Sequence, residues 1–340
     1  GEDCNINYTR ELSRIHLEEL KITTYGLGEK KKSGVVSTGA SELEKLKDEH
    51  TIIAHILDYR ETAKLKSTYI DSLPKLVQED GRIHTTFDQF GASTGRLSSS
   101  NPNLQNIPIM SEDGREIRKA FVADKNYELV SFDYSQIELR VAAHMADDKK
   151  MIEAFQKKED IHRLTASEVY NIPYDQVTPE LRRAAKTLNF GVLYGMGSQA
   201  LAENTGMSRT DAKKFIDEYF KKFSGIKRYM EETKKFAYEH GYVQTLFGRK
   251  RFIPEIFSAG WKFKRDAERM AINMPIQGTA TGDIVKIAMV KLDKWLKKNK
   301  LEDKVKMLLQ VHDELVFEIQ KDILKDTAPK IREIMEKAAE

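Results

Sequence analysis

The stretch RRAAKTLNFGVLYGMG, residues 182–197, carries the most distinctive pattern in this chain of 340 residues. Residues four apart lie on one face of a helix, so Arg182, Lys186, Phe190 and Tyr194 would form a single row. Two cations followed by two aromatic rings suit a triphosphate with a base at its far end, because cations bind phosphate oxygens and flat rings stack on bases. The plainer alternative is a solvated basic stripe beside two aromatic residues of the core.

The composition excludes several classes of protein. Hydrophobic residues make up 40% of the chain and charged residues 32%, and no apolar run approaches the roughly 18–20 residues of a membrane span. The single cysteine, Cys4, excludes an internal disulfide framework and indicates a reducing compartment, so we expect a cytoplasmic protein. The net charge is only +3, but basic residues gather in clusters of the kind that bind polyanions.

Hydrophobic periodicity and turn-forming residues predict mixed α and β structure. Helical patterns occupy residues 41–47, 50–66, 135–146, much of 160–240, 261–273 and 282–299. Strand patterns occupy residues 82–90, 127–133, 243–256 and 307–319, the last as a hairpin around a polar tip. Residues 26–39 are predicted to form a flexible basic loop. Residues 91–108 also form a polar loop, whose backbone suits a phosphate chain, with Arg96 and Gln105 as donors.

Two aspartates stand at the ends of predicted strands. Asp133 ends an apolar strand, and Asp313 lies at the tip of the apolar hairpin. If these strands pair, both carboxylates project from one edge of a sheet, where their mutual repulsion favours a divalent cation such as Mg²⁺. Two such ions would activate an attacking hydroxyl and neutralise a leaving group in phosphoryl transfer. Taken singly, Asp133 is equally a charge at a helix N-terminus and Asp313 a turn former.

Glu138 is compatible with two interpretations. Ser135 and Glu138 have the S-x-x-E spacing of a capping box, in which the carboxylate bonds back to the Ser135 amide. A carboxylate at this place would also exclude a 2′-hydroxyl by its volume if a nucleotide sugar lay beside it. The spacing alone does not separate these two interpretations.

Five segments together resemble one family. DYSQIELR (133–140), RRAAKTLNFGVLYG (182–195) and QVHDE (310–314) resemble the three polymerase motifs of family A DNA polymerases, the bacterial DNA polymerase I type. TGRLSSSNPNLQNIP (94–108) and ERMAINMPIQGTA (268–280) resemble two further segments of that family. The resemblance implies an α+β right-hand polymerase with an antiparallel palm sheet, helical fingers and a partial thumb. The implied parts are a partial thumb at 1–80, palm at 81–150, fingers at 151–277 and a second palm part at 278–340.

The resemblance also implies an activity and its residues. The expected activity is template-directed DNA synthesis from deoxynucleoside triphosphates on a primer–template, with two Mg²⁺ ions held by Asp133, Asp313 and the Tyr134 carbonyl. The other implied catalytic residues are Lys186, as a proton donor to pyrophosphate, and Glu314. The implied nucleotide-binding residues are Arg182, Lys186, Phe190, Tyr194, Glu138, His162 and Gln136. The implied DNA-binding residues are Arg96, Gln105, Arg269, Asn273, Gln277 and His312.

Some features depart from the family pattern. The segment GTATGDIVK (278–286) carries one residue more than is usual after Gln277. Such a residue is either absorbed in a helix cap or rotates the following helix by about 100°. Pro329 either starts a helix or kinks one. Relatives that accept dideoxynucleotides have Tyr at the position of Phe190. The resemblance therefore implies that this chain rejects dideoxynucleotides.

The ends of the chain lead to further expectations. The chain starts within the family's thumb and stops before its last palm strand, so a bare sheet edge and an unpartnered apolar face at Ile331, Ile334 and Met335 are expected. No D-x-E exonuclease signature is found near the N-terminus, so no proofreading is expected from this chain. We expect a monomer, to which an accessory chain could supply missing segments. The alternative function is a catalytically silent fragment that only binds primer–template DNA.

Overall fold

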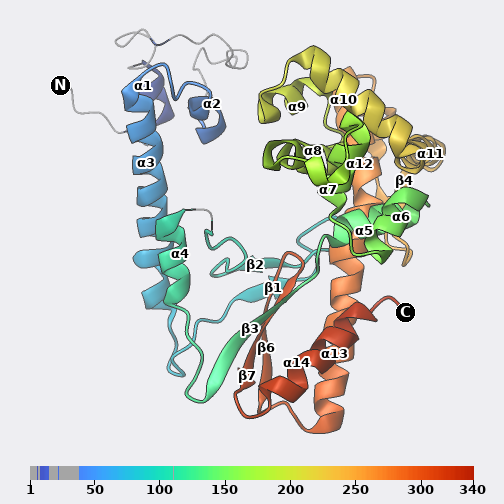
Figure 1. The fold of residues 1–340 in the computed structure, drawn as a ribbon. Helices are drawn as coiled ribbons and strands as arrows, with labels where there is room; N and C mark the ends of the chain where they lie inside the picture. Colours follow the sequence, from blue (N-terminus) through green and yellow to red (C-terminus); the bar gives the residue numbers. More distant parts are fainter. Residues whose placement is uncertain (1–5, 7, 15–21, 23–37, 110) are drawn as a thin grey trace. The chain divides into compact units, whose positions relative to one another are not determined.

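Figure 1 shows the computed structural model of the chain, which describes residues 6, 8–14, 22, 38–109 and 111–340. The chain divides into two compact units. Unit 1 contains Gly1–Thr85 and Asn106–Phe121, and unit 2 contains Thr86–Gln105 and Val122–Glu340. Cys4 and most of the predicted basic loop at 26–39 lie outside the described residues.

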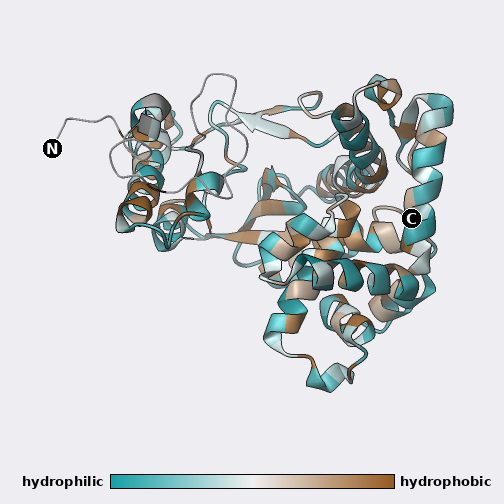
Figure 2. Cartoon of the chain, turned by 90° about the horizontal axis from the view of Figure 1, so that it is seen from above, coloured by the Kyte–Doolittle hydropathy of each residue, from teal (hydrophilic) through white to brown (hydrophobic). Residues whose placement is uncertain are grey.

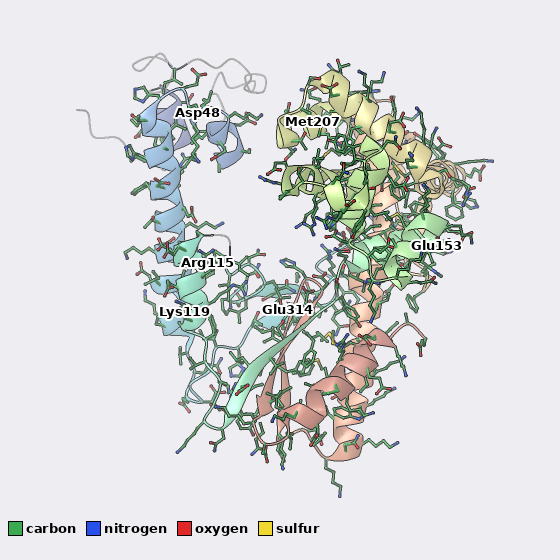
Figure 3. All side chains as sticks on the ribbon, in the orientation of Figure 1. Asp48, Arg115, Lys119, Glu153, Met207 and Glu314 are labelled. Atoms are coloured by element: carbon green, nitrogen blue, oxygen red, sulfur yellow. The ribbon has the colours of Figure 1, made fainter. Side chains whose placement is uncertain are left out.

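Unit 1 is helical in its described part. Its elements are α1 (Thr9–Arg14), α2 (Ala40–Glu44), α3 (Thr51–Leu65), η2 (Lys66–Ile70), η3 (Leu73–Leu76) and α4 (Glu112–Lys119). The helices predicted at 41–47 and 50–66 are therefore confirmed. Leu43, Ile53 and Ile56 are buried in a small apolar cluster between α2 and α3. On α4, Figure 3 labels Arg115 and Lys119, and Arg118 fixes the preceding loop by donating to the carbonyls of Ile107 and Pro108.

The central element of unit 2 is an antiparallel sheet in the order β3-β7-β6. Its strands are β3 (Tyr127–Asp133), β6 (Val305–Val311) and β7 (Glu314–Gln320), so the predicted strand and hairpin are confirmed. The hairpin turn has neither Gly nor Asn, and His312 adopts the left-handed φ of 53° that the turn requires. The turn points toward the helical part of unit 2 (Figure 1).

One face of this sheet is covered by α13 (Val285–Asn299) and α14 (Leu324–Glu336). Leu315, Phe317 and Ile319 of β7 are fully buried in the cluster that these helices complete. The expectation of an unpartnered face on α14 is wrong, because Ile331 and Met335 are buried against this cluster. Pro329 lies inside α14, which continues through it as one helix.

The helical part of unit 2 surrounds a second core. Its helices are α5 (Ile137–Met145), α6 (Lys149–Gln156), α7 (Ile161–Tyr170), η4 (Tyr174–Gln176), α8 (Pro179–Leu193), α9 (Ser198–Thr205), α10 (Arg209–Lys222) and α11 (Ser224–His240). Asp160 caps α7, and Pro179 starts α8, as the sequence predicted. Leu188, Tyr219 and Phe223 are almost completely buried in this core. Hydrophilic and hydrophobic residues alternate along the helices (Figure 2), as expected where one face is buried.

Two short hairpins complete unit 2. β1 (Thr86–Asp88) pairs with β2 (Ser98–Ser100), and β4 (Tyr242–Gln244) pairs with β5 (Lys250–Phe252). The strand expected over 82–90 is therefore only three residues long. A one-turn helix, η5 (Pro254–Phe257), follows β5.

The segment with the extra residue is continuously helical. α12 (Trp261–Gln277) leads into the π-helical turns of η6 (Gly278–Ile284) and then into α13. The expectation of two separate helices is thus wrong, and so is that of an extra residue absorbed in a cap. A π-turn accommodates one more residue because its backbone bonds span five residues instead of four. Ile276 and Ala280 belong to the helical core, whereas Val285 and Ala288 belong to the sheet core, so the two flanks serve different cores.

Candidate nucleotide-binding and catalytic site

A cavity of about 310 Å³ lies in unit 2 where the sheet edge meets α5, α7 and α8. A volume in this range is typical of small-molecule sites. Its lining contains nine of the predicted site residues and Ile137: Asp133, Tyr134, Gln136, Ile137, Glu138, His162, Arg182, Lys186, Phe190 and Asp313. The structure therefore brings together, from four separate segments, most of the residues expected to bind metal and nucleotide.

Carboxylates gather at the end of the paired strands. Asp133 lies opposite Glu314 in the register of β3 and β7, and the Tyr134 amide donates to the Asp313 carbonyl at 3.1 Å. Ser131 donates to Oε1 of Glu314, whose position at the start of β7 is labelled in Figure 3. Burial, together with the charges of Asp313 and Glu314, raises the pKa of Asp133 to about 6. Burial also raises the pKa of Asp313.

Helix α8 presents a cationic and aromatic face to the cavity. Arg182, Lys186 and Phe190 all line it, which confirms the predicted row for these three residues. Tyr194, the fourth residue of the predicted row, is the C-cap of α8 and does not line the cavity. Nε of Arg182 donates to Oδ2 of Asp160 at 2.7 Å, a contact that the sequence did not indicate. Burial opposes ionisation of Asp160, but the hydrogen bonds from Arg182 and from the Arg163 amide hold the pKa of this carboxyl below its usual range. The Arg182 guanidinium is thus fixed at the cavity wall.

His162 is buried and neutral. Burial lowers the pKa of His162 to about 4, and the nearby charges of Arg182 and Lys186 act in the same direction. Nδ2 of Asn189 lies 3.0 Å from Nδ1 of His162 and also contacts the Thr165 hydroxyl. With Nδ1 accepting, the ring proton is on Nε2. Asn189 was not predicted from the sequence, although an amide among the apolar residues of the 182–197 stretch was the available signal.

The capping-box interpretation of Glu138 is wrong. Helix α5 begins one residue later than that interpretation requires, with Gln136 at its N-cap in the left-handed conformation (φ 55°). Glu138 instead accepts hydrogen bonds from two distant residues. Nη2 of Arg96 contacts its Oε1 at 2.5 Å, and the Tyr194 hydroxyl donates to its Oε2. Its side chain is therefore oriented by tertiary contacts at the edge of the cavity.

The six residues expected to contact DNA do not line this cavity. Nε2 of Gln105 donates to the Gln310 carbonyl at 3.0 Å, and Gln310 in turn donates to the His312 carbonyl. Gln310 is buried, and no role was predicted for it from the sequence. Arg269 pairs with Asp266 on α12, where Asn273 and Gln277 are half-buried.

Comparisons with known proteins decide the family. The sequence model of DNA polymerase family A matches residues 1–340. This chain belongs to DNA polymerase family A. It is 46% identical over 337 residues to a thermostable DNA polymerase I of Thermus aquaticus, covering 99% of this chain and 40% of that protein. It is 45% identical over 341 residues to the DNA polymerase I of Pseudomonas aeruginosa, covering 100% of this chain and 37% of the relative.

The POL domain of Pol1 from M. smegmatis, solved in a complex with DNA primer-template and dNTP, has the same fold. The TM-score is 0.92 at 41% identity, and the match covers 100% of this chain and 59% of that one. The predicted α+β polymerase fold is therefore confirmed. The chain spans about 40% of the length of the curated relatives. In its described part, no helix is both long and apolar enough to cross a membrane.

Proposed function

We propose that this family A chain catalyses template-directed DNA synthesis, adding deoxynucleoside triphosphates to a primer 3′-hydroxyl. The observation that carries the proposal is the single cavity that joins Asp133 and Asp313 to Arg182, Lys186 and Phe190. Carboxylates, cations and an aromatic ring are the groups that metal-bound triphosphate and base require. The M. smegmatis relative was solved with a DNA primer-template and a dNTP, which supports the proposal.

The triphosphate would lie along α8. The guanidinium of Arg182 and the ammonium of Lys186 line the cavity one helical turn apart, so they would bind neighbouring phosphates. His162 is neutral and would donate from Nε2 to a phosphate oxygen. The contact with Asp160 fixes the Arg182 guanidinium before the nucleotide arrives, which reduces the entropy cost of binding.

The donor set at the sheet edge suits Mg²⁺. Among the described residues, no group of three or more His, Cys, Asp and Glu side chains is arranged to hold a metal ion. Two aspartates are nevertheless the share that a protein contributes where substrate phosphates complete the coordination. Burial, and after it the negative charges of Asp313 and Glu314, raise the pKa of Asp133, and a divalent cation would offset that repulsion. Asp133, Asp313 and the Tyr134 carbonyl would hold two Mg²⁺ ions, which supply Lewis acidity to the reacting oxygens when bound.

In the reaction, the primer 3′-oxygen forms a bond to the α-phosphorus as the bond from that phosphorus to the β-phosphate oxygen breaks. The 3′-hydroxyl proton passes to solvent water, and pyrophosphate leaves. Lys186 would donate a proton to the departing pyrophosphate, and Arg182 would stabilise its charge. Glu314, opposite Asp133, would reinforce the field that attracts cations to this edge. Catalysis then rests on positioning and charge neutralisation.

The remaining residues would select the substrates. Glu138 would act as a steric gate against a 2′-hydroxyl, while Phe190 would pack near the sugar and base, and Gln136 would border the nucleotide. Tyr194, which bonds to Glu138 here, would stack beside the template. The proposed contacts to primer–template come from Arg96, Gln105, Arg269, Asn273, Gln277 and His312.

Primer extension with all four dNTPs and Mg²⁺ tests the proposal. The wild-type chain should extend a primer according to the template, and the Asp133→Ala variant should lose this activity while keeping its affinity for DNA. Absence of extension by the wild-type chain, with salt-sensitive DNA binding retained, would overturn the proposal in favour of a fragment that only binds DNA.

A further inference from the structure

The π-helical segment η6 is connected to the cavity by a row of polar contacts. Thr281, in the middle of η6, contacts Arg96, and Arg96 contacts Glu138 at the cavity. We infer that Thr281 is a positioning residue for sugar selection, because it fixes Arg96 and thereby the Glu138 carboxylate. This inference rests on the proposed DNA synthesis and adds a specificity-determining residue supplied by the segment with the extra residue.

The Thr281 hydroxyl can accept a hydrogen bond from the Arg96 guanidinium in only one orientation. Its side chain is buried, and its hydroxyl donates to the Gln277 carbonyl at 2.9 Å. A hydroxyl has a single proton, so the remaining lone pairs of Oγ1 must accept, and Nε of Arg96 donates to them at 2.5 Å. The direction of the Thr281–Arg96 bond is therefore fixed by the helix itself.

The loop that carries Arg96 is pressed against η6. A Cβ on Gly282 would lie 2.5 Å from the Thr94 carbonyl oxygen, and a Cβ on Gly278 would lie 3.1 Å from the same atom. The two glycines therefore allow an approach that larger residues would block. A second pair secures the loop, because Arg249 contacts Asp283 of η6 at 2.8 Å and lies directly against Gly95.

The guanidinium of Arg96 transmits this placement to the cavity. It is planar and rigid, so the bond from Nε to Thr281 sets the direction of Nη2, which contacts Oε1 of Glu138. The other oxygen of Glu138 accepts from Tyr194, a residue proposed to stack beside the template. Both carboxylate oxygens are thus held, and the gate keeps one orientation. Without the Thr281 hydroxyl, the side chain of Arg96 would no longer be held in this direction, and the Glu138 carboxylate would rotate with it.

Single-nucleotide incorporation tests this role with an isosteric variant and a matched control. Thr281→Val replaces the hydroxyl with a methyl group of similar size, whereas Thr281→Ser keeps the hydroxyl. Thr279→Val is the control, because Thr279 is equally buried in η6 and its hydroxyl accepts from the Leu246 amide at 3.0 Å. We expect Thr281→Val to lower the ratio of kcat/KM for dNTP over rNTP about tenfold, mainly through the KM for rNTP. Thr281→Ser and Thr279→Val should keep the wild-type ratio.

Two results would overturn the inference. One is that Thr281→Val keeps the wild-type ratio of kcat/KM for dNTP over rNTP. The other is that Thr279→Val lowers this ratio as much as Thr281→Val does, which would indicate a general effect of disturbing η6. A thermal double-mutant cycle of Thr281→Val and Glu138→Ala gives a readout that needs no polymerisation. Because both residues share Arg96, the double variant should lose less Tm than the sum of the single losses. Additive losses would contradict the coupling even if the chain proved inactive, so failure of the proposed function remains distinguishable.

Discussion

Asp133 and Glu314 lie directly opposite each other on the paired strands β3 and β7, with Asp313 next to Glu314 in the hairpin turn. Three carboxylates therefore share one end of a sheet. Ser131 donates to one oxygen of Glu314. Burial, together with the charges of Asp313 and Glu314, raises the pKa of Asp133 to about 6. Such a cluster costs folding free energy and attracts cations.

Replacing Asp133 should therefore stabilise the metal-free chain. We expect Asp133→Asn to increase the free energy of unfolding at pH 7.5 by about 1 kcal/mol, a value reduced for solvent screening. Because the folded pKa lies above the unfolded one, this gain should be full above pH 6 and disappear as the pH falls toward 4.

Denaturant unfolding in EDTA measures this gain, and Asp322→Asn, just beyond the other end of β7, is the control. Added Mg²⁺ should raise the Tm of the wild-type chain more than that of Asp133→Asn. Equal stabilisation of both by Mg²⁺ would argue against an ion at Asp133.

The neutral His162 predicts an acid-sensitive fold. Its folded pKa of about 4 lies below the ordinary value, so the unfolded chain binds more protons between about pH 6.5 and 4. The contribution of His162 to stability should therefore be lost as the pH falls through this window, by about 2–3 kcal/mol. In chemical unfolding at several pH values, the free energy of unfolding should fall less steeply with decreasing pH for His162→Gln than for the wild-type chain. The same pH dependence in both chains would show that His162 does not titrate in this way.

Asn189 should matter for both stability and nucleotide binding. Asn189→Leu leaves Nδ1 of His162 without this partner, while the Thr165 hydroxyl keeps its bond to the Ile161 carbonyl, so we expect a loss of about 1–3 kcal/mol. His162 would also lose its fixed tautomer, so the KM for dNTP should rise more than kcat falls. Steady-state kinetics checks this split. Thr187→Val should change neither quantity, because the Thr187 hydroxyl donates to the Arg183 carbonyl of the same helix and contacts neither His162 nor Asn189.

Phe190 should set the response to dideoxynucleotides. We expect the wild-type chain to discriminate against them, and Phe190→Tyr to reduce this discrimination by about tenfold, because a phenol hydroxyl can replace one missing hydrogen bond near the sugar. Competitive incorporation of a dNTP and its dideoxy analogue measures the ratio. Equal incorporation of the dNTP and its dideoxy analogue by the wild-type chain would contradict the prediction.

The sequence alone predicted the features that depend on local geometry. The row of Arg182, Lys186 and Phe190 follows from the helical period, which the backbone imposes wherever a helix forms. Asp133 and Asp313 were placed at strand ends because alternating apolar residues reveal where strands stop. The motif order then sufficed for the family, and the match to the family A sequence model confirmed it.

Tertiary structure decided which partners these residues have. Glu138 had a plausible local partner in Ser135, yet it bonds to Arg96 and Tyr194, which lie 42 and 56 residues away in the sequence. The extra residue after Gln277 was visible in the sequence, but the sequence did not show how the fold accommodates it. The flanking helices are anchored in two different cores, so a π-turn takes up the residue while each flank keeps its buried face. Local patterns specify elements because the backbone is periodic, whereas contacts across the chain depend on how those elements pack together.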